Sequence, residues 1–383
     1  MASGARTLRS IVLLGALDLL VVSAWLFFRI ATVPKKAGSQ PSSILQVLHL
    51  QATPQCNPQE HVVFVKVQKA GSSTVQNIFY RFGTNRNLTF MLPKYGNYIS
   101  YSTCVKDREV MSLPVFKDRY DISCNHVKYN RTAFEKYMHP DTSYVGIIRH
   151  PLTLLNSYIY YFLEHVVPGK DKLEEFLRDP DHYAGQRNVS FNLLTNYFGL
   201  SSKRARNSTE VKMFTNQIDK EFHIMLVLEL IDESLLLMKR QFCWNLTDIL
   251  YIRKNARDGT PSVKNATMIS KDKHRTIADA DYTFYRHFHK KMQDKVFQEG
   301  LDFQKELLYF RQVREAVRKY CTRQLWRVDG PLRFPSSPWQ TAFMVTSETC
   351  QLMDMPELKF QDIVGSRQYG PVWKAVHRSQ LYH

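Results

Sequence analysis

The fold is decided by residues 61–74, which read His61-Val62-Val63-Phe64-Val65-Lys66-Val67-Gln68-Lys69-Ala70-Gly71-Ser72-Ser73-Thr74. Residues 61–65 are a short run of β-branched and aromatic residues, which is typical of a buried strand. Apolar residues then recur at positions 75, 78, 79 and 82, which is the spacing of one face of a helix. The pattern therefore predicts a strand, a short loop and a helix.

The loop between these two elements, residues 66–74, has the composition of an anion site. A loop of small residues that runs into a helix exposes backbone N–H groups at the positive end of the helix dipole. Lys69 and the hydroxyls of Ser72, Ser73 and Thr74 would complete a cradle for a phosphate or a sulfate. Lys69 precedes the Gly-Ser-Ser-Thr run instead of ending it, which disfavours the P-loop of kinases and ATPases. Taken alone, the stretch is equally compatible with an ordinary strand–helix turn that has a Ser N-cap.

A second strand–helix unit is predicted at residues 143–162. Residues 143–149 form another apolar run, His150-Pro151 ends it, and residues 152–162 have the pattern of an amphipathic helix that carries Ser157. Arg149 at the end of the strand and Ser157 in the helix would close on a second phosphate, with Arg as a bidentate fork. The alternative is that Arg149 only ends the sheet and Ser157 lies on the helix surface.

Composition and charge limit the class of protein. The 383 residues are enough for a membrane anchor plus one large or two small domains, and 44% hydrophobic with 23% charged residues is typical of a packed domain. Against 35 Asp and Glu there are 52 Lys and Arg, and this net charge of +17 favours anionic partners. The sequence has no zinc-finger spacing and no RNP-type aromatic stretch, so we expect no nucleic-acid partner.

The N-terminal part has the pattern of a membrane anchor. Residues 11–28 are apolar apart from Asp18, which predicts a transmembrane signal-anchor after a cytoplasmic tail of residues 1–10. Prolines and polar residues in 29–59 predict an extended lumenal stem, and the catalytic domain is expected over 60–383. A cleaved signal peptide is the alternative to the anchor.

Glycosylation sequons and cysteines place the long C-terminal part in the lumen. Six Asn-x-Ser/Thr sequons follow the apolar run, at Asn87, Asn130, Asn188, Asn207, Asn245 and Asn265. The six cysteines contain no C-x-x-C pair, which argues against structural zinc and thioredoxin-like chemistry. Their connectivity cannot be read from the sequence, and Cys321 with Cys350, which flank a Pro-rich stretch, is the first pairing to expect.

The two anion motifs together resemble known binding elements. Lys69–Thr74, and Arg149-His150-Pro151 with Ser157 eight residues after the arginine, resemble the 5′-phosphosulfate and 3′-phosphate elements of sulfotransferases. The chain more closely resembles the galactose 3-O-sulfotransferases, the family that includes galactosylceramide sulfotransferase. The likeness runs from about Val62 to about Phe360. Other stretches that carry it are Ser123–His126, Glu174–Pro180, Asp232–Leu235, Cys243-Trp244, Asn255–Arg257, Tyr285–Phe288 and Met355–Leu358.

The resemblance implies a fold, a reaction and a compartment. The fold would be α/β, a P-loop-like (nucleotide-kinase-like) parallel sheet flanked by helices. The reaction would move a sulfuryl group from 3′-phosphoadenylyl sulfate (PAPS) to a hydroxyl, O-3 by resemblance, of a β-galactosyl residue on a glycolipid or glycoprotein. The protein would be a single-pass type II Golgi membrane protein with a lumenal catalytic domain. Neither the chemistry nor any ligand cluster implies a metal, and the oligomeric state stays open.

The resemblance also implies a role for each site residue. Lys69 would neutralise charge on the leaving oxygen, and His126 would take the proton of the sugar hydroxyl because imidazole titrates near neutral pH. The 5′ side would be held by the amides of Ala70 and Gly71 and by Ser72, Ser73 and Thr74. Arg149 and Ser157 would hold the 3′-phosphate.

The loop departs from the family at one position that matters chemically. The family's loop usually reads Lys-Thr-His-Lys-Thr-Ala-Ser-Ser-Thr, whereas this chain has Gln68 for the His, Ala70 for the Thr and Gly71 for the Ala. After the second-site Arg, His150 stands where the family has Asp. A glutamine cannot take a proton near pH 7. Either His126 is the base, or the chain is a weakened paralogue that binds glycan or nucleotide in the lumen. A basic glycan-binding module without catalysis would leave the two phosphate elements unexplained.

Overall fold

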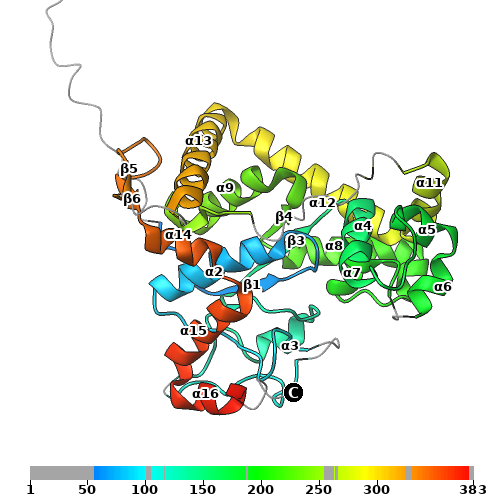
Figure 1. Cartoon of the computed structure of the whole chain (residues 1–383), viewed down its shortest axis with the longest axis horizontal. Coiled ribbons are helices and arrows are strands. Elements are labelled where there is room, and N and C mark those ends of the chain that lie inside the picture. The colour runs from blue at the N-terminus through cyan, green and yellow to red at the C-terminus, as the bar shows by residue number, and fades with distance from the viewer. Residues whose placement is uncertain are drawn as a thin grey trace, which may run out of the picture. The chain divides into compact units, whose positions relative to one another are not determined.

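The computed structural model describes residues 56–100, 105–115, 117–186, 189–253, 263, 266–324 and 330–378. The compact unit Cys56–His383 is built on a four-stranded parallel sheet in the order β2-β1-β3-β4, flanked by helices (Figure 1). The expected α/β class with a parallel sheet is therefore confirmed. The expected span at 11–28 lies outside the described ranges, and none of the helices within those ranges is long and apolar enough to cross a bilayer.

The sheet forms because its strands are apolar on both faces. Every residue of β1, β3 and β4 is buried, as expected for parallel strands that are covered on both sides. Val62 of β1 pairs with Ile122 of β2 on one side and with Ser143 of β3 on the other. The strands are β1 Val62–Val65, β2 Ile122–Ser123, β3 Ser143–Ile148 and β4 Ile224–Val227, and a separate antiparallel pair consists of β5 Leu332–Phe334 and β6 Phe343–Val345.

The helices cover the sheet in groups (Figure 1). Helices α9 and α12 pack on β4, α10, α14 and α15 pack on α2, and α4 packs on α5 and α7. The α-helices are α2 Ser72–Asn85, α3 Arg131–Glu135, α4 Pro151–Phe162, α5 Lys172–Arg178, α6 Pro180–Gly185, α7 Leu193–Tyr197, α8 Ser208–Glu221, α9 Ile231–Phe242, α10 Leu246–Ile249, α11 Met268–Ile277, α12 Asp279–Gln298, α13 Gly300–Gln324, α14 Ser347–Asp354, α15 Glu357–Tyr369 and α16 Pro371–Arg378. The 3-10 helices are η2 Arg204–Arg206 and η3 Leu228–Leu230.

Both predicted strand–helix units are present with small changes at their ends. The first strand is β1, and its helix α2 begins at Ser72, within the predicted loop. The second helix, α4, begins at Pro151, which occupies the first turn where its missing N–H is not needed. The strand that precedes His126 is short: β2 is Ile122–Ser123, and the backbone amides of Tyr120 and Asp121 just before it bond to the carbonyls of Tyr137 and Thr89.

Two disulfides join distant parts of the unit. The expected Cys321–Cys350 bond is confirmed, and it joins α13 to α14. A second bond, Cys56–Cys243, joins the start of the unit to the end of α9. Among the cysteines of the described ranges, Cys124 is a free and buried thiol, and Cys104 lies outside those ranges.

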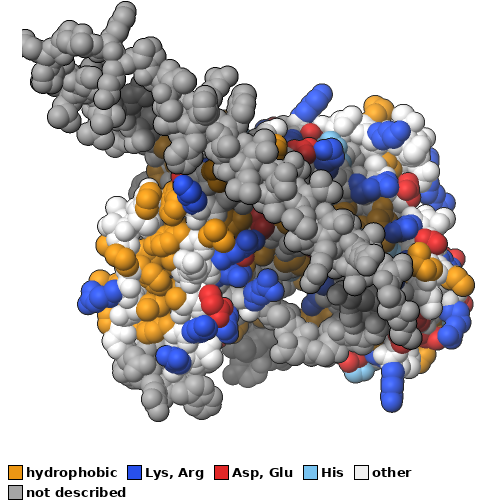
Figure 2. All heavy atoms as spheres, turned by 90° about the horizontal axis from the view of Figure 1, so that it is seen from above, with side chains coloured by type: hydrophobic (Ala, Val, Ile, Leu, Met, Phe, Trp, Pro, Cys, Tyr) orange, Lys and Arg blue, Asp and Glu red, His pale blue; other side chains and the backbone are white. Residues whose placement is uncertain are grey.

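Most of the sequon asparagines within the described ranges lie on the surface. Asn87, Asn207 and Asn245 are exposed and Asn130 is half-buried, while Asn188 and Asn265 lie outside the described ranges. Figure 2 shows Lys and Arg side chains spread over one face, among hydrophobic side chains, without gathering in one stripe.

Candidate active site

The loop between β1 and α2 is a tight turn that depends on Gly71. Gly71 has φ 73°, and a Cβ built there would lie 2.6 Å from Leu228 Cδ1, so both the backbone and the space favour glycine. The Ser72 hydroxyl donates to the Val67 carbonyl at 2.5 Å and closes the turn from inside. Gly71 has no side chain to cap α2, and the first turn of the helix is uncharged. The start of α2 therefore has the electrostatics of an anion site.

Lys69 lies at the mouth of this turn. Its backbone is in the left-handed region at φ 60°, which is uncommon for a residue other than glycine. Its Nζ lies 3.6 Å from the centroid of the Tyr161 ring at the end of α4, a cation–π contact. The loop residue that was predicted to act on the leaving group thus contacts the helix that follows the second predicted phosphate element.

Arg149 links the two predicted phosphate elements. It follows β3, and its Nη1 donates to the Lys69 carbonyl at 2.7 Å while Nε donates to Thr153 Oγ1 at 3.1 Å. Burial lowers the pKa of Arg149, and the Glu229 carboxylate opposes this. Ser157 is half-buried on α4, one turn beyond Thr153, so the two side chains share a helix face. The structure thus places Arg149 beside Lys69 and places Ser157 on the α4 face that Arg149 contacts.

His126 follows β2 and is almost fully buried. Its Nδ1 lies 3.2 Å from the Lys66 carbonyl, which can only accept, so Nδ1 carries the proton and Nε2 keeps its lone pair. Burial, together with the positive charge of Lys66, lowers the pKa of His126 well below 6.5. The imidazole is therefore neutral at mildly acidic pH, in a tautomer that can accept a proton at Nε2.

Gln68, the residue that replaces the family's loop histidine, contacts the neighbour of His126. Its Nε2 donates to the Tyr98 hydroxyl. The Tyr98 ring in turn stacks on the His126 imidazole, with centroids 4.7 Å apart and an interplanar angle of 18°. Tyr98 belongs to no motif, so sequence reasoning missed this contact.

A buried ion pair between Lys66 and Glu357 lies at the start of the loop that follows β1. Lys66 is completely buried, and its Nζ lies 2.5 Å from Glu357 Oε1, an oxygen that also accepts from Asn97 Nδ2 at 3.2 Å. Burial lowers the pKa of Lys66, and Glu357 partly offsets this. Sequence reasoning missed this ion pair. The one feature of the sequence that could have indicated it is the position of Lys66 directly after an apolar strand.

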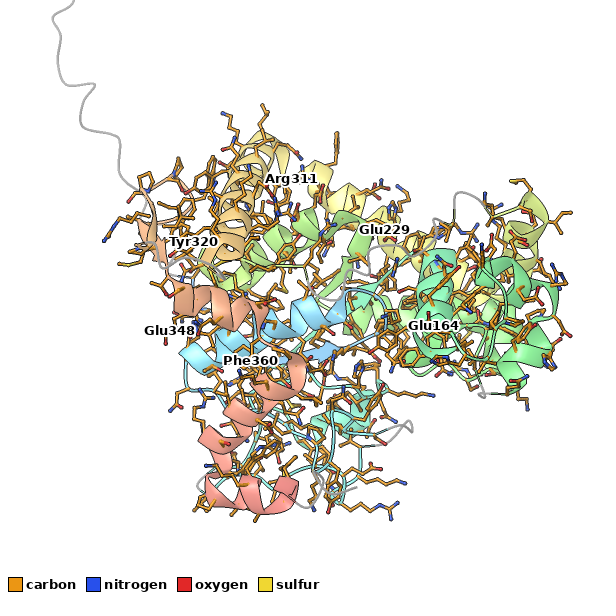
Figure 3. All side chains as sticks on the ribbon, in the orientation of Figure 1. Glu164, Glu229, Arg311, Tyr320, Glu348 and Phe360 are labelled. Atoms are coloured by element: carbon orange, nitrogen blue, oxygen red, sulfur yellow. A yellow bond between two sulfur atoms is a disulfide. The ribbon has the colours of Figure 1, made fainter. Side chains whose placement is uncertain are left out.

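His150, which stands where the family has Asp, packs between aromatic rings. Its backbone amide donates to Glu229 Oε1 at 2.8 Å, and its ring meets Tyr282 and Tyr285 edge-on at 5.6 and 5.4 Å. Glu229, labelled in Figure 3, also accepts from the Tyr285 hydroxyl at 3.3 Å. Burial lowers the pKa of His150. Position 150 therefore holds the start of α4 against α12.

A cavity of about 240 Å³ opens beside the first turn of α2. Ser73 is part of its wall, together with residues on the same face of α2, Arg253 and the start of α15, where Phe360 lies (Figure 3). Arg253 brings a positive charge to this cavity, while the basic residues Lys254 and Arg257 lie outside the described ranges. The cavity is wide enough for part of a ligand next to the Ser73 hydroxyl.

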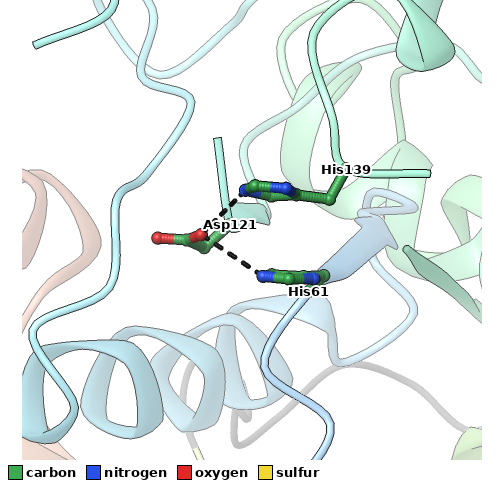
Figure 4. Close-up of side chains that lie close together, drawn as sticks. All are labelled: His61, Asp121 and His139. Atoms are coloured by element: carbon green, nitrogen blue, oxygen red, sulfur yellow. Dashed lines mark ion pairs between the residues drawn. The ribbon is translucent and has the colours of Figure 1, made fainter. Parts of the chain in front are cut away.

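The N-terminal edge of the sheet, opposite the loop, carries a different cluster (Figure 4). Within the described ranges, His61, Asp121 and His139 are the side chains close enough together to hold a metal ion. His61 Nε2 and His139 Nε2 lie 3.6 and 3.2 Å from Asp121 Oδ1, and the two rings stack at 3.9 Å with 15° between their planes. His61 Nδ1 also lies 2.7 Å from Asp141 Oδ1, so the two imidazoles and the two carboxylates form a small polar network at this edge of the sheet.

Comparison with known proteins identifies the family. Residues 4–368 match the family described as Galactose-3-O-sulfotransferase. The chain belongs to this family. It is 30% identical to galactosylceramide sulfotransferase of Bos taurus, over 74% of this chain and 70% of that protein. It is 26% identical to galactose-3-O-sulfotransferase 2 of Mus musculus, over 82% of this chain and 86% of that protein.

Membership of the galactose-3-O-sulfotransferase family makes the chain an enzyme that transfers a sulfuryl group to galactose. The family implies PAPS as co-substrate and a galactose-containing acceptor. The residues fit an anionic nucleotide: the first turn of α2 is uncharged, and Lys69 and Arg149 bring two cations to the same loop. The relatives have different names, and the type of acceptor is not resolved among them.

Proposed function

We propose that this enzyme transfers a sulfuryl group from PAPS to O-3 of a β-galactosyl residue on a glycolipid or glycoprotein glycan. The observation that carries the proposal is the hydrogen bond from Arg149 to the Lys69 carbonyl, which supports the idea that the two predicted anion elements belong to one site. A nucleotide with phosphate at both its 5′ and 3′ positions is the natural ligand for such a pair. The parallel sheet with a loop at the end of β1 supports a P-loop-like, nucleotide-kinase-like fold.

We assign the donor contacts as follows. The amides of Ala70 and Gly71, with Ser73 and Thr74, would hold the 5′-phosphosulfate at the start of α2. Ser72 would support this cradle through its bond to the Val67 carbonyl. Arg149 would bind the 3′-phosphate as a charged fork, with Ser157 beside it on α4.

Two side chains would act on the reacting atoms. The donor supplies an activated sulfuryl group, and charge grows on its bridging oxygen as the group leaves. Lys69 would stabilise that charge, a role that requires it to leave the Tyr161 ring. His126 would accept the proton of the sugar hydroxyl at Nε2, since the Lys66 carbonyl holds the other proton on Nδ1.

We place the enzyme in the Golgi membrane as a single-pass type II protein. The apolar run 11–28 would be the anchor, after a cytoplasmic tail of residues 1–10 and before a stem of residues 29–59. Residues 60–383 would form the lumenal catalytic domain. The sequons and the two disulfides support a lumenal location.

The test is transfer of labelled sulfate from PAPS by the purified full-length chain in detergent. Galactosylceramide, lactosylceramide and N-acetyllactosamine glycans serve as acceptors, and the product is mapped for the sulfated position. Transfer to galactose O-3 is the expected result. Nucleotide binding without transfer to any acceptor would instead support the second candidate, a weakened paralogue. Gln68 favours this candidate, because a glutamine side chain cannot serve as a base.

A further inference from the structure

Three aromatic side chains at the end of α4 are packed together, and two of them face solvent. Tyr161 is 59% exposed and Phe162 is 36% exposed. The Phe162 ring packs on Tyr161 and on Tyr158, with centroids 4.7 Å apart in both cases. Rings of this size are normally buried for most of their area. Tyr161 and Phe162 therefore offer an apolar surface that the fold itself does not use.

This aromatic surface lies beside the reacting centre. The Lys69 Nζ lies 3.6 Å from the Tyr161 ring centroid. The ring therefore contacts the group that would stabilise the leaving oxygen. The adjacent loop residue, Gln68, bonds to Tyr98, which stacks on His126. Burial, together with the nearby hydroxyls of Tyr98 and Tyr158, raises the pKa of Tyr197 well above 10.

The acceptor hydroxyl must come to the same place. In direct transfer the sugar oxygen attacks the sulfur of the donor, next to the leaving oxygen whose charge Lys69 would stabilise. A general base must also reach the proton of the sugar hydroxyl. Lys69 lies over the Tyr161 ring, and the Tyr98 ring stacks on His126. A sugar between the lysine and the histidine would be within reach of both aromatic groups.

Galactose suits such a surface because of its stereochemistry. Its O-4 is axial, so the C–H bonds at C3, C4 and C5 lie together on the opposite face of the ring and make an apolar patch. Aromatic rings bury such patches, while the polar groups at the edge of the sugar keep their hydrogen bonds. The O-3 hydroxyl is equatorial, so it remains free at the edge of a stacked ring.

Resting on the proposed function, we propose that Tyr161 and Phe162 form the acceptor subsite, a platform on which the apolar face of the β-galactosyl residue stacks. Lys69 lies on the Tyr161 ring in the structure, and the sugar would contact the platform once Lys69 turns to the donor. The platform would favour galactose over glucose. The O-4 of glucose is equatorial, so glucose lacks the apolar patch that the axial O-4 of galactose leaves at C3, C4 and C5. Tyr161 and Phe162 are therefore specificity-determining residues.

The variants are chosen to leave the fold intact. Tyr161→Leu removes a largely exposed ring and Phe162→Ala a partly exposed one, so both changes lie at the surface and not in the core. The Lys69 Nζ lies over the Tyr161 ring, so the Phe162→Ala variant keeps the ring that makes the cation–π contact. Phe297→Ala is the matched control, since Phe297 is 86% exposed and lies on α12. Tyr161→Phe keeps the ring and should keep more acceptor affinity than Tyr161→Leu.

Three measurements on the full-length protein in detergent test the proposal. Both ring-removing variants should raise the acceptor KM about tenfold, and the affinity for 3′-phosphoadenosine 5′-phosphate, measured by calorimetry, should stay within twofold of wild type. In the presence of that nucleotide, saturation-transfer NMR on methyl β-galactoside should show the strongest transfer to the protons at C3, C4 and C5 of wild type, and much less in the Phe162→Ala variant. Phe297→Ala should change none of these values.

The outcomes separate the platform from the function on which it rests. A wild-type protein that neither retains the nucleotide nor transfers sulfate would overturn the proposed function. A wild-type protein that transfers sulfate, with variants whose acceptor KM is unchanged, would overturn the platform alone. Equal weakening of nucleotide binding would also overturn it, because the rings would then stack on adenine.

Discussion

The Arg149 guanidinium donates from Nη1 to the carbonyl oxygen of Lys69 at 2.7 Å. This bond connects the end of β3 to the turn that follows β1, although the two residues are 80 positions apart in the sequence. Because Arg149 is a cation, one side chain both fixes the Lys69 backbone and adds charge to the donor site. Loss of the guanidinium should therefore affect donor binding at two points.

Arg149→Ala should weaken binding of 3′-phosphoadenosine 5′-phosphate by about 100-fold, since a charge-assisted hydrogen bond to a charged group is lost. Calorimetry with that nucleotide and with a matched nucleotide that lacks the 3′-phosphate measures the effect. Wild type should prefer the 3′-phosphorylated form and Arg149→Ala should not, while Arg149→Lys should lie between them. An unchanged preference in Arg149→Ala would assign the 3′-phosphate to another residue.

Lys69→Ala should lower kcat by about 100- to 1000-fold, which is the usual cost of one group that stabilises charge in a transition state. Binding of the product nucleotide should change much less, because the α2 amides and Arg149 remain. Rapid-quench assays of sulfate transfer, together with calorimetry, separate the two effects. A loss in affinity as large as the loss in kcat would mean that Lys69 binds the ground state.

The pH profile of kcat should stay flat between about pH 6 and pH 8. Burial lowers the pKa of His126 well below 6.5, so the imidazole stays neutral and able to accept a proton as the pH falls through its ordinary range. His126→Ala should lower kcat by about 100-fold or more across the same range. A wild-type kcat that halves near pH 6.5 would contradict the shift, and full activity in His126→Ala would remove the histidine from the mechanism.

Glu357→Gln should destabilise the fold, since it leaves the completely buried Lys66 ammonium without its counter-charge. Breaking one partner of a buried pair costs about 3–5 kcal/mol. Urea unfolding followed by circular dichroism measures it. The double variant Lys66→Met with Glu357→Leu should recover most of the lost stability, and a double variant as unstable as the single one would indicate that packing is responsible.

Asp281 should make stability depend on pH. Its carboxylate accepts from the Leu194 and Thr195 amides at 2.7 and 2.8 Å, and burial raises its pKa to about 7. The folded pKa lies above the unfolded value of about 3.9, so the stability that Asp281 contributes is full below pH 4 and is lost as the pH rises to 7. The unfolding free energy of wild type, measured relative to that of Asp281→Asn, should therefore fall as the pH rises from about 4 to 7. A constant difference would exclude this titration.

The parts of the fold that could be predicted are the ones written in local patterns. The strand and helix around Lys69, and those around Arg149, followed from apolar spacing, Pro151 and the small loop residues. The contacts that hold the site together were not local: Glu357 reaches Lys66 from the far end of the chain, and Tyr98 reaches His126 from an irregular segment. The exposed position of Tyr161 was also hidden, because an aromatic residue in an amphipathic helix usually packs in the core.

Every residue assigned to the site lies between Cys56 and Cys243, whose sulfurs are bonded across a separation of 187 positions. The bond closes that stretch into one covalent ring. A ring of this size restricts the unfolded chain and is worth about 5 kcal/mol in the loop-entropy description. Treatment with a reductant would therefore loosen the whole catalytic half at once, and a chain synthesised without access to an oxidant would lack its largest single topological constraint.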